Sequence, residues 1–145
     1  MADSRGSLLA SLGIEVGTKT QHIKNVTEPD IINFAEVSGD FNPVHMSEEY
    51  ARQTPFGGRI AHGMLAAALI SAAVAKLPGV VIYLSQTVSF LSLIRIGDSI
   101  TATAEVTEKD DARGILQVKT TCTNQNGEIV VDGQAKIKIY QPPSY

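Results

Sequence analysis

Cysteine, tryptophan and long hydrophobic runs are scarce or absent in this chain of 145 residues. The single cysteine, Cys122, excludes an intrachain disulfide and a cysteine-based metal site. The longest apolar run, residues 64–75, is interrupted by Ser71 and is too short to span a bilayer. The N-terminal residues lack the apolar stretch of a signal peptide. We therefore expect a cytoplasmic protein with no membrane part.

Charged residues are also few, at 19% of the chain. Twelve basic residues against 15 acidic ones leave a formal net charge of −3. The chain has no basic stripe or arginine cluster, which argues against a nucleic-acid partner. Hydrophobic residues, by contrast, reach 43%, which is enough for a globular protein with its own core.

The domain organisation that follows is simple. No internal repeat, low-complexity stretch or interdomain linker interrupts the chain. Residues 1–13 are expected to form a flexible lead-in that could hold one short helical turn. Residues 14–145 are expected to form a single domain.

Helix signals lie in the first half of this domain. Thr27 followed by Pro29 is typical of a helix start, and Gly39 is typical of a helix end. Residues 47–52 predict a second, short helix. Residues 61–76 predict a third helix, which is apolar nearly all the way round and should therefore be buried on most sides.

Strand patterns account for most of the remaining chain. The strand-like segments are residues 18–26, 80–93, 100–107, 116–122 and 129–140. The last two are joined by a turn that contains the Asn-Gly hairpin signal. Such a sheet wrapped around the apolar helix gives an α+β fold with five antiparallel, curved strands. Its exposed edges would favour a homodimer or a higher homo-oligomer.

Chemistry-bearing side chains gather in the segment 38–45. Asp40, Asn42 and His45 lie within six positions, and Pro43 restricts the backbone between them. A rigid turn of this kind can direct a carboxylate, an amide and an imidazole at one water molecule. The alternative is purely structural, because aspartate, asparagine, glycine and proline are ordinary turn residues.

The start of the apolar helix is a second candidate. The backbone N–H groups near Gly63 are unpaired donors of a helix N-terminus and could stabilise an oxyanion. Alternatively, Gly63 only permits close packing and His62 packs locally. Ser71 is the polar exception on the helix, where a serine often bonds the carbonyl four residues earlier. Asp40, His45 and His62 could also bind a metal, but no metal-binding spacing supports this and we expect none.

Two segments together carry a resemblance to a known family. Residues 38–45 read Ser-Gly-Asp-Phe-Asn-Pro-Val-His, and residues 56–64 read Phe-Gly-Gly-Arg-Ile-Ala-His-Gly-Met. Over about residues 15–140 the chain resembles the MaoC-like (R)-specific enoyl-CoA hydratases, also called hydratase 2. The resemblance implies a hot-dog fold and reversible hydration of a trans-2-enoyl-CoA to an (R)-3-hydroxyacyl-CoA. It implies no cofactor, because coenzyme A is part of the substrate.

The resemblance also implies roles for individual residues. Asp40 and His45 would be the catalytic pair that activates water and moves the proton to the α-carbon. Asn42 would position that pair or the water, and the Gly63 N–H would bind the thioester oxygen. The residues expected to contact the substrate are His62, Met64 and Ser71.

Two other functions compete with this prediction. Acyl-carrier-protein dehydratases of the same fold pair a histidine with a glutamate on the central helix, but residues 61–76 contain no carboxylate. A non-catalytic acyl-CoA-binding module would share the fold but would have no use for Asp40 and His45.

Overall fold

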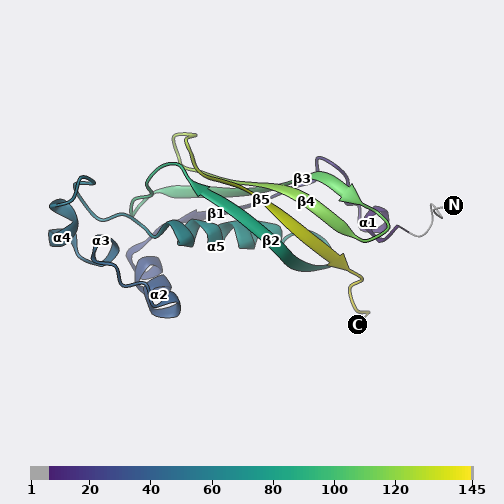
Figure 1. The fold of residues 1–145 in the computed structure, drawn as a ribbon, viewed down its shortest axis with the longest axis horizontal. Helices are drawn as coiled ribbons and strands as arrows, with labels where there is room; N and C mark the ends of the chain where they lie inside the picture. Colours follow the sequence, from purple (N-terminus) through teal and green to yellow (C-terminus); the bar gives the residue numbers. More distant parts are fainter. Residues whose placement is uncertain (1–6, 145) are drawn as a thin grey trace.

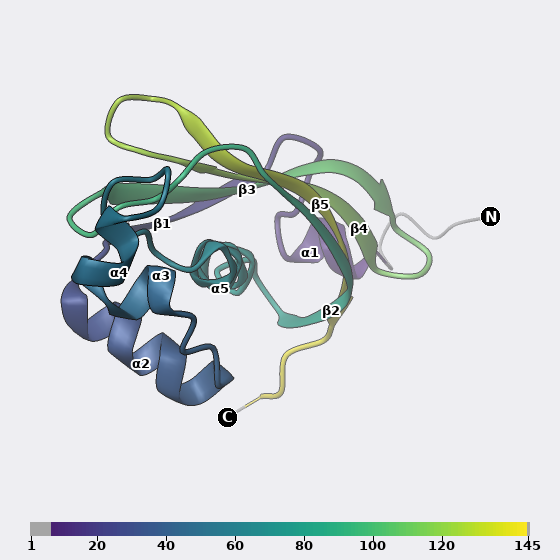
Figure 2. The ribbon, with the colours of Figure 1, turned by 60° about the vertical axis from the view of Figure 1, so that its left-hand side comes forward.

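A five-stranded antiparallel sheet packs against one central helix (Figures 1 and 2). The computed structural model describes residues 7–144. The strands are β1 (Lys19–Asn25), β2 (Val80–Phe90), β3 (Ser99–Asp110), β4 (Ile115–Thr123) and β5 (Ile129–Tyr140). Their order in the sheet is β1-β3-β4-β5-β2. The expected α+β architecture, with a five-stranded antiparallel sheet and a helix packed on it, is confirmed.

The core lies between the concave face of the sheet and the central helix α5 (Gly63–Val74). Every second residue of β3 from Ile100 to Val106 is at most 1% exposed. The same alternation runs through β4, where Leu116, Val118 and Cys122 are buried. These are the inward faces that the alternating sequence pattern predicts, because successive side chains of a strand point to opposite sides.

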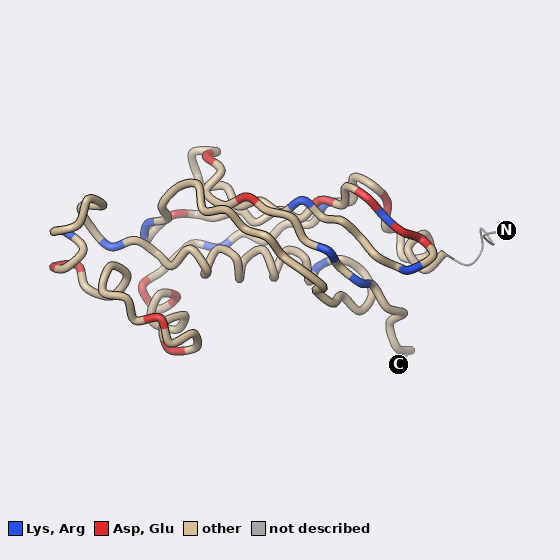
Figure 3. The backbone as a smooth tube through the Cα atoms, viewed as in Figure 1, with Lys and Arg blue, Asp and Glu red and all other residues tan. Residues whose placement is uncertain are grey.

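The prediction that the central helix is buried on most sides was wrong for one of its faces. The buried residues of α5 are Ala66, Leu69, Ile70, Ala73 and Val74, which face the sheet and the core. Met64 is 54% exposed, and Ala68, Ser71 and Ala75 follow it on the same face. The reason is geometric: one sheet can cover only one side of a helix, and nothing within the described chain covers the other. No charged residue lies on α5 (Figure 3).

Residues 7–13 pack against the domain more closely than the sequence suggests. Residues Leu8–Ser11 form helix α1, in agreement with the expected helical turn. Leu9 and Ile14 are both fully buried in the core. The described part of the expected flexible lead-in therefore packs against the domain, because Leu9 fills the core. Residues 1–6 lie outside the described chain.

Three short helices form a layer at one end of the sheet (Figure 1). They are α2 (Glu28–Ser38), α3 (Pro43–Met46) and α4 (Glu48–Arg52). Thr27 caps α2 and forms a capping box with Asp30, as its position in the sequence predicts. Helix α3 was expected only as a rigid turn. It is a single helical turn because Pro43 occupies its first position and Asn42 caps it.

None of the helices within residues 7–144 is long and apolar enough to cross a membrane. The longest is α5, with 12 residues. A helix of 12 residues is about 18 Å long, which is well short of a bilayer core of about 30 Å.

Candidate active site

Helix α2 ends at Gly39, and Asp40 follows at once. Gly39 has a φ of 80°, a left-handed conformation that glycine adopts without a steric penalty. This turn redirects the chain. The Asp40 carboxylate then accepts a hydrogen bond from the Asn42 N–H at 3.1 Å. The structural role of the turn residues and a role in chemistry are therefore compatible, because Oδ1 of Asp40 is held by the backbone while Oδ2 makes no hydrogen bond among the described residues.

Asn42 acts on the backbone of helix α3. Its side-chain oxygen accepts a hydrogen bond from the Val44 N–H at 3.4 Å, which caps the helix. The helix carries His45 at its third position. Asn42 therefore holds the segment that orients His45. Its role in positioning the catalytic pair or the water stays a prediction.

His45 is only 8% exposed, and a single hydrogen bond determines which of its nitrogens is available. Its Nδ1 lies 2.8 Å from the carbonyl oxygen of Ile60. A carbonyl can only accept, so Nδ1 carries the proton and Nε2 of the neutral ring has a free lone pair. Burial lowers the pKa of His45 below its ordinary value of 6.5, which favours the neutral ring near pH 7.

Arg59 holds His45 from the backbone side. Its Nε donates to the His45 carbonyl oxygen at 2.6 Å, and its Nη1 lies 2.7 Å from Glu28 of helix α2. The Arg59 side chain is 12% exposed and the Glu28 side chain is 48% exposed, so water reaches this ion pair from the Glu28 side. The sequence gives no signal for this link, because Glu28 is 31 residues away.

Gly63 is the first residue of α5, and its N–H is therefore one of the unpaired donors of a helix N-terminus. No backbone acceptor within residues 7–144 bonds to it. A Cβ atom on Gly63 would lie 2.7 Å from Cδ1 of Phe90, so a side chain does not fit here without moving that ring. Phe90 was not singled out in the sequence, because its proximity to Gly63 is a tertiary contact.

Asp40, His45 and Gly63 line one cavity of about 280 Å³. His62 and Met64 line it too, and most of the remaining wall is apolar: Ile60, Ala61, Phe90, Leu93, Ile94 and Val131. The cavity thus combines a carboxylate, an imidazole lone pair and a helix N-terminus in a mostly apolar setting. Such a site can transfer protons to and from one bound water and stabilise a negative oxygen nearby.

Ser71 does not line this cavity. It lines a neighbouring cavity of about 440 Å³ between α5 and β2, together with Ala68, Tyr83 and Gln86. Met64 borders both cavities and lies between the dyad and Ser71. The expected bond from the Ser71 hydroxyl to the carbonyl four residues earlier is not among the hydrogen bonds of the described residues.

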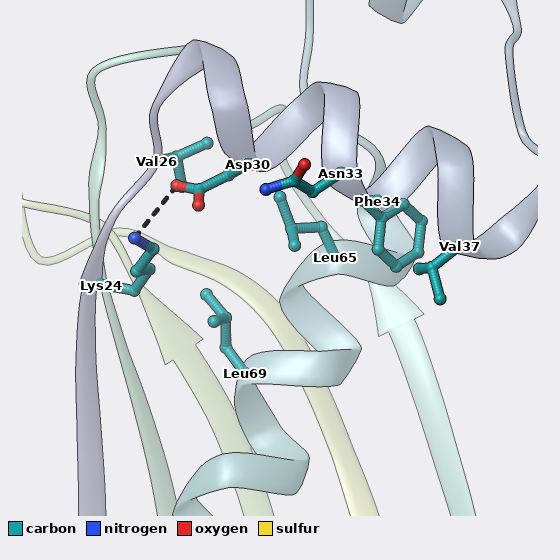
Figure 4. Close-up of a pocket in the computed structure, with 8 residues that line it drawn as sticks. All are labelled: Lys24, Val26, Asp30, Asn33, Phe34, Val37, Leu65 and Leu69. Atoms are coloured by element: carbon teal, nitrogen blue, oxygen red, sulfur yellow. Dashed lines mark ion pairs between the residues drawn. The ribbon is translucent and has the colours of Figure 1, made fainter.

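Helix α2 leaves a third cavity, of about 330 Å³, where it crosses α5 (Figure 4). Val26, Phe34, Val37, Leu65 and Leu69 provide its apolar walls. At its rim Lys24 and Asp30 form an ion pair at 3.2 Å. Phe34 separates this cavity from the dyad, because its ring packs against His62 with 4.8 Å between the ring centroids.

Asp40, His45 and His62 are also the residues best placed to hold a metal within the described chain. Each offers one ligand atom, and these atoms lie within 4.8 Å of one another. Ligands at about 2.0–2.2 Å from a zinc ion lie closer together than this outer limit. One nitrogen of each histidine is already bonded to a backbone carbonyl. The other nitrogen of each ring is left to face a ligand, an arrangement that is common at metal sites and at proton-transfer sites alike.

Comparison with known proteins extends over most of the chain. The family model described as a MaoC like domain matches residues 12–127. A 3-hydroxybutyryl-CoA dehydratase of Methylorubrum extorquens is 42% identical over 87% of this chain and 81% of its own. An (R)-specific enoyl-CoA hydratase of Rhodospirillum rubrum is 41% identical over 87% and 88%, respectively. A plant relative, the mitochondrial 3-hydroxyacyl-[acyl-carrier-protein] dehydratase of Arabidopsis thaliana, is 33% identical over 91% and 81%.

The fold comparison agrees with the sequence comparison. The solved structure of an (R)-hydratase of A. caviae involved in PHA biosynthesis superposes with a TM-score of 0.84. It is 37% identical and covers 88% of this chain and 98% of its own. The chain therefore belongs to the family of MaoC-like domains.

Proposed function

We propose that this protein is an (R)-specific enoyl-CoA hydratase, which adds water reversibly to a trans-2-enoyl-CoA to give an (R)-3-hydroxyacyl-CoA. One observation carries the proposal. The carboxylate of Asp40, the neutral imidazole of His45 and the N–H of Gly63 meet at one mostly apolar cavity. The relatives named as CoA hydratases and dehydratases support the substrate class.

The proposed reaction needs only these groups and water. The free Nε2 of His45 and the Asp40 carboxylate hold one water molecule between them. As its oxygen bonds to C3, one O–H bond breaks and the dyad takes the proton. The C2–C3 π electrons move towards the thioester, whose oxygen gains charge and accepts a hydrogen bond from Gly63. The dyad then delivers a proton to C2 on the same face.

The tautomer of His45 indicates which of its two nitrogens can act as the base. Because Nδ1 donates to Ile60, Nε2 is the nitrogen with a lone pair for the water proton. A carboxylate oxygen of Asp40 lies within 4.8 Å of a ring nitrogen of His45 and completes the proton path.

The proposed substrate is an acyl-CoA thioester, and the proposed partner is a second copy of the chain. Strand β2 is an edge of the sheet, and its Ile82 and Leu84 are 45% and 50% exposed. The open face of α5 lies beside it and carries Met64. Apolar surface on an unpaired edge is typical of an interface. The buried free thiol of Cys122 suits the reducing cytoplasm, where we place the enzyme.

The competing substrate is an acyl group on acyl-carrier protein. The similarity to the plant dehydratase favours testing it directly. The absence of a carboxylate on α5 argues against the histidine–glutamate pairing of the acyl-carrier-protein dehydratases. Rates with crotonyl-CoA and with crotonyl-acyl-carrier protein at equal concentration separate the two substrates.

The decisive experiment measures the loss of crotonyl-CoA absorbance and the configuration of the product. Asp40→Asn and His45→Gln should each lower kcat by about 10²-fold or more, because each removes one half of the dyad. Matched controls are Asp132→Asn, an exposed aspartate on β5, and His22→Gln on β1. The proposal fails if either dyad variant turns over like wild type while folded, or if the product is the (S)-alcohol.

A further inference from the structure

His62 contacts both members of the dyad. Its Nε2 is 2.9 Å from the backbone carbonyl oxygen of Asp40. Its ring packs on the ring of His45, with 4.0 Å between the centroids and 31° between the planes. Phe34 packs against the same imidazole from helix α2. The side chain of His62 is only 1% exposed, so it is enclosed by these neighbours and not by water.

The hydrogen-bond pattern determines which nitrogen of His62 acts as a donor. The Asp40 carbonyl can only accept, so Nε2 carries a proton and donates it. Nδ1 is buried and has no partner within the described chain. His62 therefore uses its Nε2 donor to hold the Asp40 carbonyl.

This position links the three parts of the site. Asp40 belongs to the loop after α2, His45 belongs to α3, and His62 immediately precedes Gly63 at the start of α5. One side chain thus holds the carboxylate loop by a hydrogen bond and the imidazole by stacking. It is also covalently attached to the proposed oxyanion donor. Without the His62 side chain, the loop after α2, helix α3 and the start of α5 would not be joined at one point.

We propose that His62 is a positioning residue of the hydration reaction, which fixes the distance between Asp40 and His45 and aligns both with the Gly63 N–H. This inference rests on the proposed function and refines the expectation that His62 contacts the substrate. The hydrogen bond and the stacking act on the dyad rather than on the acyl chain. Small displacements of reacting groups reduce rates strongly, so losing either contact should lower kcat.

Two substitutions separate the two contacts. His62→Gln retains an N–H donor near the position of Nε2 but has no ring. His62→Phe retains the ring but has no donor. We expect each to lower kcat for crotonyl-CoA at least tenfold and to leave KM within about twofold. His22→Gln is the matched control, because His22 lies on β1 and does not line the cavity.

A second measurement needs no substrate. The chain has only three histidines, so ¹⁵N spectra of histidine-labelled protein resolve the tautomer and pKa of each ring. The charged or titratable groups that influence His45 are Asp40, Arg59 and His62. In His62→Phe the pKa of His45 should rise, because the Coulomb interaction with His62, which lowers this pKa, is lost and an aromatic face attracts a cation. If His62 only filled space in the cavity wall, His62→Phe would leave the pKa of His45 unchanged.

Every outcome decides between the alternatives. Folded His62→Gln and His62→Phe proteins with wild-type kcat would overturn the proposal. A rise in KM at unchanged kcat would also overturn it and would assign His62 to substrate binding. If wild-type protein does not hydrate crotonyl-CoA or its acyl-carrier-protein form, the proposed function fails. The spectra then still test the link, and an unchanged pKa and tautomer of His45 in His62→Phe would refute it.

Discussion

At the scale of single residues, the chemistry depends on which backbone carbonyl each imidazole faces. The Ile60 carbonyl oxygen accepts a hydrogen bond from Nδ1 of His45, and the Asp40 carbonyl oxygen accepts one from Nε2 of His62. Two histidines in contact thus adopt opposite tautomers. One keeps a free nitrogen at the cavity, and the other is enclosed. Burial lowers the pKa of His45, which favours its neutral form.

The first prediction concerns pH. Because burial lowers the pKa of His45, the acid limb of the kcat/KM profile should have its midpoint below pH 6.5. The unfolded chain binds this proton at about its ordinary pKa, so His45 should also cost stability as pH falls below that value. His45→Gln should therefore show a smaller loss of Tm than wild type between pH 7.5 and 5. An acid limb centred above pH 6.5 would contradict the prediction.

At the scale of elements, the start of α5 decides where negative charge can be stabilised. His62 precedes the helix with φ −60° and ψ 129°, and Gly63 is its first residue. The first turn holds no acidic residue that would occupy its free donors. The N–H groups there point outward from the helix end, and Phe90 packs directly over Gly63. A helix N-terminus in an apolar cavity favours an oxyanion.

The second prediction concerns a variant that lacks the N–H donor of residue 63 but retains helix α5. Proline is accepted at the first helical position, and the extended conformation of His62 suits the residue before proline. Phe90→Ala makes room for the new ring, since Phe90 occupies that space. Gly63→Pro in the Phe90→Ala background should lower kcat by about 10²–10³-fold. Gly63→Ala in the same background keeps the N–H and should stay close to Phe90→Ala alone.

This comparison separates the hydrogen bond from steric effects. If the proline variant is folded and retains kcat within a few-fold of the alanine variant, Gly63 is not the oxyanion donor. Circular dichroism and Tm of the three proteins establish that they are folded.

At the scale of the whole molecule, the two sides of α5 differ. The sheet covers one side, and the helices α2 to α4 gather at one end (Figure 2). The side near β2 stays open, with apolar residues on the helix and on the edge strand. The register of β2 against β5 shifts at Leu84, where a bulge projects this residue. An uncovered apolar face next to the site is the reason to expect a second copy.

The third prediction tests which edge of the sheet forms the proposed dimer interface. Leu84→Lys on β2 should convert a wild-type dimer into a monomer in sedimentation equilibrium, because it buries a charge in the interface. Ile23→Lys is the matched control, since Ile23 is 65% exposed on β1 at the opposite edge. A monomeric wild-type protein, or dissociation by Ile23→Lys alone, would contradict the proposed interface.

Much of the fold could be predicted because its signals are local. The capping residues of α2, the alternation of β3 and the hairpin before β5 each depend on a few neighbouring residues. Errors arose where burial depends on distant partners. Leu9 was placed in a flexible segment because nothing near it in sequence shows that it fills the core. The open face of α5 was missed because composition cannot say how many sides are covered.

The same distinction between local signals and distant contacts applies to the candidate site. The sequence alone determined the short spacing of Asp40, Asn42 and His45 and a helix that begins near Gly63, because turns and caps depend on neighbouring residues. The tertiary structure decided that these segments share a cavity. It decided which nitrogen of each histidine is free, how Arg59 reaches His45, and that Ser71 lies in a neighbouring cavity. Those features depend on contacts between residues far apart in the chain, which only the packing of the elements brings together.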